Sequence, residues 1–302
     1  MAIVINVNGR IAHGTSATIP VLDHGFLYGE GVYEVCRTYH GHPLLFDRHM
    51  RRMRNSAGMI GLAVPFTDRE ALGLVNETLT AAGLATAGGP GPEAYVRLLL
   101  TRGVGELSYD PAACSQPSVV IIVKPHVEPE PHIYELGVRV SIVPVVRNHA
   151  LSLNPLIKSN NLLNNALAMQ HAIQHGAFEA VMRNLRGEIA ECSQSNLFIV
   201  KGESAFTPPV EAGLLAGITR EFLFDVAQEI GIPMTESVMT DEDLLSADEA
   251  FLTSTTREVV PIVLVDEHRI GAGRPGPVTR ALLEGFRRRA DLLTAGRGHQ
   301  QG

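Results

Sequence analysis

One lysine stands in the polar, asparagine-rich stretch Leu156-Ile157-Lys158-Ser159-Asn160-Asn161-Leu162-Leu163-Asn164. Pro155 precedes this stretch, and a helical pattern from Leu162 to His175 follows it. The pattern ends at Gly176, a typical C-cap. Taken alone, a lysine in such a segment is most often a solvated side chain. Whether Lys158 has a functional role therefore depends on motifs elsewhere in the chain. The same motifs indicate the fold class.

The composition is that of an ordinary globular protein, with 45% hydrophobic and 19% charged residues among 302. A chain of this length can bury a sizeable core and is expected to form two domains. The net charge of -7 gives no reason to expect binding of nucleic acid or of an anionic membrane surface. No apolar run approaches the roughly 20 residues that span a bilayer, and the N-terminus lacks a signal-peptide pattern.

The three cysteines, Cys36, Cys114 and Cys192, are an odd number and have no metal-ligand spacing. They indicate reduced thiols in a cytoplasmic protein. The histidines form no convincing metal-binding pair at helical spacing, so we expect no metal site.

Residues 1–124 are expected to form a small α/β domain. Two segments in it alternate as strands, and each places aromatic and basic side chains on one face: Tyr33, Arg37 and Tyr39 in residues 31–39, and Tyr95 and Arg97 in residues 94–101. Such a face is either a wet outer surface or the wall of a polar pocket.

A helix is expected after these first strand residues, with Asp47 as its cap. It carries four apolar residues inward: Met50, Met53, Ala57 and Ile60. Arg52 and His49 then lie together at one margin of the apolar stripe.

A proline-rich linker over residues 125–135 is expected to follow the first domain. The larger second domain then spans residues 136–302. Its tail, from about residue 295, is rich in glycine and glutamine and is expected to be disordered.

Three features suggest one phosphorylated, electron-withdrawing cofactor. The helix start Gly217-Ile218-Thr219 offers backbone N–H groups and a favourable dipole to a phosphate, although alone it is usually only a cap. The run from Thr253 to Thr256 offers hydroxyls and backbone donors at a strand end. Arg52 offers a permanently charged, bidentate partner.

Glu191 lies on a short apolar strand, and a buried carboxylate needs a partner. A protonated pyridine nitrogen would serve, and so would a structural arginine. The residues alone leave both possibilities open.

In their order along the chain, these motifs resemble those of the class IV aminotransferases, the pyridoxal-phosphate enzymes of fold type IV. The resemblance runs from about Asn6 to Phe286 and rests on six segments: Asp23-His24-Gly25-Phe26-Leu27-Tyr28-Gly29-Glu30-Gly31-Val32-Tyr33-Glu34, His49-Met50-Arg51-Arg52, Lys158-Ser159-Asn160-Asn161, Glu191-Cys192-Ser193-Gln194-Ser195-Asn196-Leu197-Phe198, Gly217-Ile218-Thr219-Arg220 and Thr253-Ser254-Thr255-Thr256-Arg257-Glu258. It implies a two-domain α/β (α+β) fold, with a small N-terminal domain and a larger domain built on a mixed, barrel-like sheet.

The resemblance also implies roles for individual residues, with pyridoxal 5′-phosphate as cofactor. Lys158 would be the Schiff-base lysine and the base that moves the substrate's α-proton, and Glu191 would pair with the pyridine nitrogen. The phosphate and its surroundings would be held by Arg52, Asn196, Gly217, Ile218, Thr219 and Thr255. The substrate would be bound by Tyr28, Tyr33, Arg37, Tyr95, Arg97, Thr255 and Thr256. The substrates would be an amino donor and a 2-oxo acid, and the family implies a homodimer.

The substrate is left open between members of this family. Tyr95-Val96-Arg97, with Tyr33 and Arg37, resembles the branched-chain enzymes. The loop from Gly103 to Tyr109 lacks the Arg-X-His of the D-amino-acid enzymes. Both features favour branched-chain L-amino acids with 2-oxoglutarate.

Two departures point toward D-amino-acid or R-selective amine transaminases. Leu163 stands where branched-chain enzymes usually have a tyrosine, and Val32-Tyr33-Glu34-Val35 replaces a phenylalanine-glutamate-glycine pattern. Aminodeoxychorismate lyase is the third alternative. A binding protein without activity is the least favoured, since both Lys158 and Glu191 are present.

Overall fold

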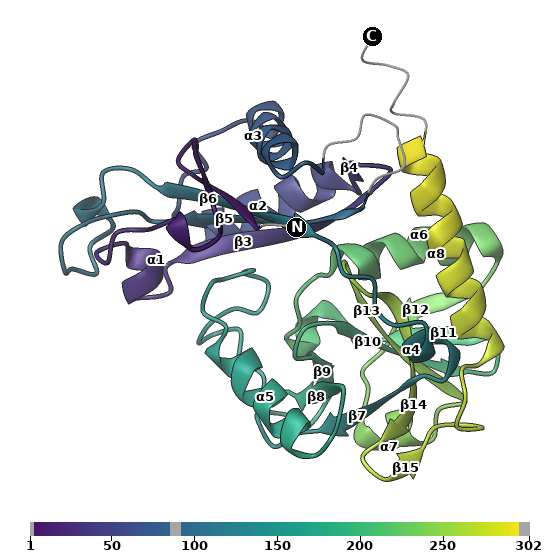
Figure 1. The fold of residues 1–302 in the computed structure, drawn as a ribbon. Helices are drawn as coiled ribbons and strands as arrows, with labels where there is room; N and C mark the ends of the chain where they lie inside the picture. The colour runs from purple at the N-terminus through teal and green to yellow at the C-terminus, as the bar shows by residue number, and fades with distance from the viewer. Residues whose placement is uncertain (1–2, 85–91, 296–302) are drawn as a thin grey trace. The chain divides into compact units, whose positions relative to one another are not determined.

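The computed structural model describes residues 3–84 and 92–295 of the chain. It consists of two compact units (Figure 1). Among the described residues, the first comprises 3–84, 92–127, 157–161 and 290–295, and the second comprises Glu128–Leu156 and Leu162–Arg289. This division differs from the expected boundaries, because the short segment that holds Lys158 belongs to the first unit.

The first unit is built on a six-stranded sheet in the order β2-β1-β6-β5-β3-β4. Every pairing in it is antiparallel. Its strands are β1 (Val4–Val7), β2 (Arg10–His13), β3 (Gly31–Tyr39), β4 (His42–Pro43), β5 (Ala94–Thr101) and β6 (Ser118–Pro125). The alternating patterns in residues 31–39 and 94–101 are confirmed as strands.

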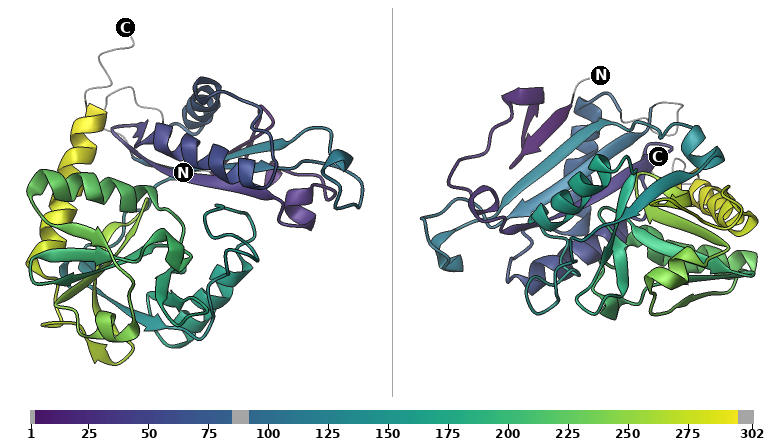
Figure 2. Two further views of the ribbon diagram at one scale, coloured as in Figure 1. Left: turned by 180° about the vertical axis from the view of Figure 1, so that it is seen from behind. Right: turned by 90° about the horizontal axis from the view of Figure 1, so that it is seen from below.

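Two helices, α2 (Phe46–Met59) and α3 (Asp68–Ala81), cover one face of this sheet (Figure 2). They close a core with side chains from alternate strand positions, among them Met50, Met53, Val75, Val32 and Val96. Thr67 caps α3 through a capping box with Glu70, which satisfies backbone donors of the first turn. Other short elements are α1 (His24–Leu27), η1 (Gly14–Ser16) and η2 (Pro111–Ala113).

The prediction that Asp47 caps α2 is wrong. The N-cap is Leu45, which has a left-handed backbone and makes no side-chain capping bond. The helix begins at Phe46, and Asp47 lies in its first turn. Burying Phe46 against the core decides the start of the helix, at a position where sequence favours a polar cap.

The second unit is built on a nine-stranded mixed sheet in the order β12-β11-β10-β13-β14-β7-β8-β9, with β15 paired to β14. The pairs β11–β12, β14–β7 and β7–β8 are parallel. The strands are β7 (Val138–Ile142), β8 (Glu179–Arg183), β9 (Ile189–Cys192), β10 (Asn196–Lys201), β11 (Ser204–Thr207), β12 (Met234–Glu236), β13 (Glu249–Ser254), β14 (Glu258–Val265) and β15 (His268–Arg269).

This sheet curls (Figure 1), as the expected barrel-like core requires. Strand β9 ends the order of the sheet, yet only the residues 193–195 separate it from β10, the third strand from the other end. The turn between them is closed by the bond from Cys192 N–H to Ser195 O, at 2.8 Å. Curling therefore brings distant strands of the sheet to one turn.

Five helices complete the described part of the chain: α4 (His132–Glu135), α5 (Leu163–Gln174), α6 (Ile218–Ile230), α7 (Asp241–Leu245) and α8 (Pro277–Ala295), with the short η3 (Val210–Ala212). The expected disordered tail lies outside the described residues, apart from Ala295 at the end of α8. Among the described residues, no helix has both the length and the apolar composition needed to cross a bilayer.

Candidate active site

Lys158 is placed by β3 and α2 within the first unit. Its carbonyl accepts a hydrogen bond from Tyr33 N–H at 2.9 Å, and its own N–H donates to Ser56 Oγ at 3.1 Å. Asn160 N–H donates to Gly31 O at 2.9 Å. The half-buried Lys158 side chain reaches the Tyr33 ring, with Nζ 4.6 Å from the ring centroid. Lys158 is therefore held in a defined position rather than free on a surface loop.

The buried face of α2 brings two more polar groups to this region, and both bind Glu34 on β3. Arg52 donates from Nε to Glu34 Oε1 and from Nη2 to Glu34 Oε2, both at 2.7 Å. His49 Nδ1 lies 2.7 Å from Glu34 Oε2. The prediction that Arg52 and His49 lie together is confirmed, because they share one carboxylate.

Electrostatics explains how these groups stay buried together. Burial alone would raise the pKa of Glu34, but Arg52 and then His49 outweigh it and hold that pKa well below its usual range. For His49, burial lowers the pKa, against the opposing pull of Glu34. The group is therefore a carboxylate–guanidinium pair with a neutral histidine. Glu34 was missed as a site residue, although its place on the apolar face of the strand signals a charge that needs partners.

The opposite face of the first sheet carries the expected substrate residues of β3 and β5. The guanidinium carbon of Arg97 lies 4.0 Å from the Tyr33 ring centroid, so Arg97 and Lys158 both contact this ring. Arg37 and Tyr95 are paired across the two strands, further along the sheet. The structure thus brings Tyr33, Arg97 and Lys158 together.

Tyr28 lies elsewhere in the first unit. It follows α1, and its ring packs against His24 and Tyr109, with centroid distances of 4.9 and 5.1 Å. The structure does not place it with Tyr33 and Arg97 through any contact among the described residues.

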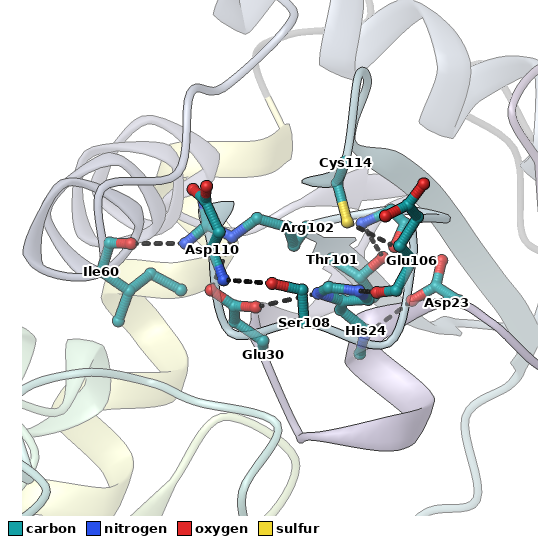
Figure 3. Close-up of polar contacts among 12 residues, drawn as sticks. Asp23, His24, Glu30, Ile60, Thr101, Arg102, Glu106, Ser108, Asp110 and Cys114 are labelled. Atoms are coloured by element: carbon teal, nitrogen blue, oxygen red, sulfur yellow. Dashed lines mark hydrogen bonds and ion pairs between the residues drawn. The ribbon is translucent and has the colours of Figure 1, made fainter. Parts of the chain in front are cut away.

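Buried polar groups tie α1 to the loop after β5 (Figure 3). His24 Nε2 lies 2.9 Å from Glu106 O. Arg102 donates to Glu30 Oε1 and to Ile60 O, both at 2.6 Å. Asp23 accepts from Thr101 Oγ1 at 3.0 Å. This network holds α1 and the 103–109 loop as one edge of the first unit.

Glu191 is buried on β9 in the second unit. Its Oε1 accepts from Arg147 Nε at 2.7 Å, and its Oε2 accepts from Leu215 N–H at 3.1 Å. Asn196 Nδ2 approaches Oε2 at 3.4 Å. Of the two partners that the sequence left open, the structure provides an arginine. Arg147 was missed because it stands far from Glu191 in the chain, in a loop without secondary structure.

Helix α6 begins beside Asn196. Its N-cap is Gly217, and no side chain caps its first turn. A Cβ at Gly217 would overlap Asn196 Oδ1, so any other residue would force the Asn196 side chain to move. The buried residues Ile218 and Thr219 follow in the first turn, where the backbone N–H groups of a helix lack intrahelical acceptors.

The run from Thr253 to Thr256 ends β13 next to Asn196, since Asn196 and Thr253 are partners in the pairing of β10 with β13. The second unit therefore gathers the remaining expected cofactor residues: Glu191, Asn196, Gly217, Ile218, Thr219 and Thr255, with Thr256 in the same turn. Across the described ranges, no group of three or more His, Cys, Asp or Glu could hold a metal ion.

The chain is similar to proteins of one known family. Residues 31–265 match the family model described as amino-transferase class IV. A protein of Methanocaldococcus jannaschii, named provisionally as a branched-chain-amino-acid aminotransferase, is 38% identical and aligns over 94% of this chain and 95% of its own. The D-alanine aminotransferase of Staphylococcus haemolyticus is 33% identical, over 93% and 95%.

Solved structures agree with this likeness. The branched-chain amino acid aminotransferase of Escherichia coli matches with a TM-score of 0.89 at 29% identity, covering 100% of this chain and 97% of that one. The branched-chain aminotransferase of Thermoproteus uzoniensis, solved with norvaline, matches with a TM-score of 0.87 at 32% identity, over 99% and 97%. A third branched-chain amino acid aminotransferase, solved with pyridoxamine 5′-phosphate, matches with a TM-score of 0.87 at 28% identity, over 96% and 94%.

Proposed function

Because this chain belongs to the class IV aminotransferases, we propose that it moves an amino group between branched-chain L-amino acids and 2-oxoglutarate. Aminotransferases of this class use pyridoxal 5′-phosphate, which is the cofactor of this enzyme. The roles of single residues and the identity of the substrates are the proposed part.

The residues present fit this cofactor. Lys158 supplies an amine, held by β3 and α2, for a covalent link to the aldehyde carbon. Arg52, oriented by Glu34, and the first turn of α6, which no side chain caps, suit a phosphate. Ile218, Thr219 and Thr255 would complete that phosphate site, and Glu191 would face the pyridine nitrogen.

When bound, the cofactor supplies an electron-withdrawing ring that stabilises the charge left at the substrate's α-carbon. Lys158 would act as the base through Nζ, accepting the substrate's α-proton and donating it again. Glu191 would keep the ring nitrogen protonated, and Arg147 fixes the Glu191 carboxylate through its 2.7 Å bond. Arg52 would offer its guanidinium to the cofactor's phosphate, and Thr219 would offer its backbone N–H.

One observation carries the choice of substrate. Arg97 stacks on the Tyr33 ring that Lys158 also contacts, with distances of 4.0 and 4.6 Å to the ring centroid. A cation at this place suits the second carboxylate of 2-oxoglutarate, while the half-buried side chains of Tyr33 and Val35 offer apolar area to a branched side chain. The likeness to the branched-chain enzymes supports the same substrate.

Transamination of D-amino acids is the second candidate. D-alanine aminotransferases of several bacteria are 32–34% identical to this chain. Position 163, where the branched-chain enzymes usually have a tyrosine, is an exposed leucine at the start of α5.

Parallel spectra decide between these substrates. The purified enzyme is mixed in turn with L-leucine, D-alanine and R-1-phenylethylamine, and conversion of bound pyridoxal 5′-phosphate to the pyridoxamine form is followed by absorbance. We expect fast conversion with L-leucine. No change with L-leucine, together with fast conversion by D-alanine or by the amine, would replace our first choice.

We also propose a homodimer in the cytoplasm. Large apolar side chains are exposed on the edge formed by α1 and the 103–109 loop, where Phe26, Leu107 and Tyr109 are 65%, 74% and 87% exposed. A patch of this kind is typical of an interface. The three cysteines are free, which agrees with a reducing compartment. Light scattering that gives a fully active monomer would contradict the dimer.

A further inference from the structure

Glu179 is a fully buried carboxylate at the start of β8 to which the mechanism above gives no role. Its Oε1 accepts from Gln194 N–H at 3.0 Å and from the Ser193 hydroxyl. Its Oε2 accepts from Arg257 Nη2 at 2.8 Å and from Ser195 Oγ at 3.4 Å. One side chain therefore holds two separate segments of the second unit.

The first segment is the turn between β9 and β10. This turn stands directly between Glu191 and Asn196, the two residues that meet at Glu191 Oε2. Ser193 N–H donates to Ala180 O at 2.9 Å, so the turn also packs on β8 beside Glu179. By binding the turn, Glu179 sets the position from which both site residues leave it.

The second segment is the turn between β13 and β14, which carries Thr255 and Thr256. Arg257 closes this turn with two hydrogen bonds to Ser254. Its Nε donates to Ser254 Oγ at 3.2 Å, and its backbone N–H donates to Ser254 O at 3.3 Å. The same guanidinium reaches Glu179. The two threonines thus lie within a turn whose closing arginine is fixed by a buried carboxylate.

The end of this turn is held as well. Glu258 has a φ of 58°, a backbone conformation that residues other than glycine rarely adopt. Its carboxylate is bound by Arg287 Nε at 2.7 Å. Tyr134 Oη donates to Arg257 O at 3.1 Å. A turn with an unfavourable backbone conformation needs such anchors to keep one shape.

We propose that Glu179 is a positioning residue for the cofactor. Through Arg257 it fixes the turn that presents Thr255 to the phosphate, and through Gln194 and the two serines it fixes the turn that presents Glu191 to the ring nitrogen. This inference rests on the proposed function of these site residues. Arg257 is then the residue that connects Glu179 to the turn with Thr255 and Thr256.

The test is a titration of the full-length apoprotein with pyridoxal 5′-phosphate, followed by absorbance, for wild type, Glu179→Gln and Arg257→Met. The amide keeps the shape of Glu179 but removes the charge that pairs with Arg257. We expect each variant to bind about tenfold more weakly, since a charge-assisted hydrogen bond behind the site is lost. The ³¹P resonance of the bound cofactor should shift in both variants, which a general loss of stability would not produce.

The double variant Glu179→Gln/Arg257→Met separates a joint role from two independent ones. Because Glu179 acts partly through Arg257, the affinity lost in the double variant should be smaller than the sum of the losses in the two single variants. Losses that simply add would show that Glu179 does not act through Arg257. Lys201→Met is the matched control, because it breaks the exposed ion pair with Asp243 in the same unit. It should bind the cofactor like wild type.

The outcomes are distinct. Unchanged affinity and an unchanged ³¹P resonance in Glu179→Gln or in Arg257→Met would overturn this inference while leaving the proposed function intact. A wild-type protein that does not bind pyridoxal 5′-phosphate would reject the proposed function itself. If Glu179→Gln does not fold, Arg257→Met carries the test, because it removes the same ion pair from the more exposed side.

Discussion

Arg52 binds both oxygens of the Glu34 carboxylate, through Nε and Nη2, at 2.7 Å each. The plane of the guanidinium is therefore set by a strand residue on the buried face of the first sheet. This relationship explains how an arginine on the buried face of α2 is held in one orientation, as the proposed phosphate site requires, and it leads to the first prediction.

Glu34→Gln should lower both stability and cofactor affinity. The substitution leaves the Arg52 cation without its buried counter-charge, which typically costs about 3–5 kcal/mol of unfolding free energy. Chemical denaturation and titration with pyridoxal 5′-phosphate measure the two effects. Asp47→Asn on the same helix is the control, because its pair with Arg51 is exposed and should contribute about 0–1 kcal/mol. A Glu34→Gln protein as stable as the control would contradict this account of the pair.

The buried His49 should make stability depend on pH. Burial lowers its pKa in the folded state below the ordinary value of 6.5, so the unfolded chain binds the proton more readily. Stability is then lost as the pH falls below 6.5 and is fully present above it.

Melting temperatures between about pH 7.5 and about pH 5.5 test this sign. The wild-type curve should fall more steeply toward acid than that of His49→Gln. The exposed His13 provides the control, since His13→Gln should leave the slope unchanged. Parallel curves for wild type and His49→Gln would show that His49 does not resist protonation.

Gly217→Ala should weaken cofactor binding. The new Cβ would overlap Asn196 Oδ1, so the Asn196 side chain, which also approaches Glu191, must move. We expect the affinity for pyridoxal 5′-phosphate to fall by about tenfold, since a displacement near the site disturbs hydrogen bonds to charged groups. Gly58→Ala in α2, where a Cβ meets nothing within 4 Å, should bind like wild type. Equal affinity in the two variants would mean that the Gly217 contact has no functional role.

Arg147→Met should destabilise the apoprotein by about 3–5 kcal/mol, because it leaves the buried Glu191 carboxylate without its cation. Denaturation of the apoprotein measures this loss. Arg139→Met breaks the pair with the exposed Glu267 and should cost about 0–1 kcal/mol. If both variants were equally stable, Glu191 would not depend on Arg147.

The parts of the fold that could be predicted from sequence are those with a local period. Alternation in residues 31–39 and 94–101 predicted β3 and β5, because side chains on a strand point to opposite faces. The three-residue spacing from His49 to Arg52 placed these side chains together on a helix. Both signals lie within a few residues and need no knowledge of the tertiary structure.

The parts that could not be predicted depend on pairs far apart in the chain. Arg147 meets Glu191, and Arg257 meets Glu179, through a curled sheet whose strand order no local pattern reveals. Likewise, the Lys158 segment joins the first unit through bonds to β3, whereas composition placed it in the second domain. The prediction of the α2 cap was wrong because burial of Phe46 overrides the local preference for a polar cap.

The central claim is that Lys158 forms the covalent link to the cofactor in an aminotransferase. The chain has three lysines, Lys124, Lys158 and Lys201, so the claim can be tested directly. The measurement is peptide mass spectrometry of the enzyme after loading with pyridoxal 5′-phosphate and reduction with borohydride. We predict a phosphopyridoxyl group on the peptide that contains Lys158. Labelling of Lys124 or Lys201 instead, or no labelling at all, would contradict the account.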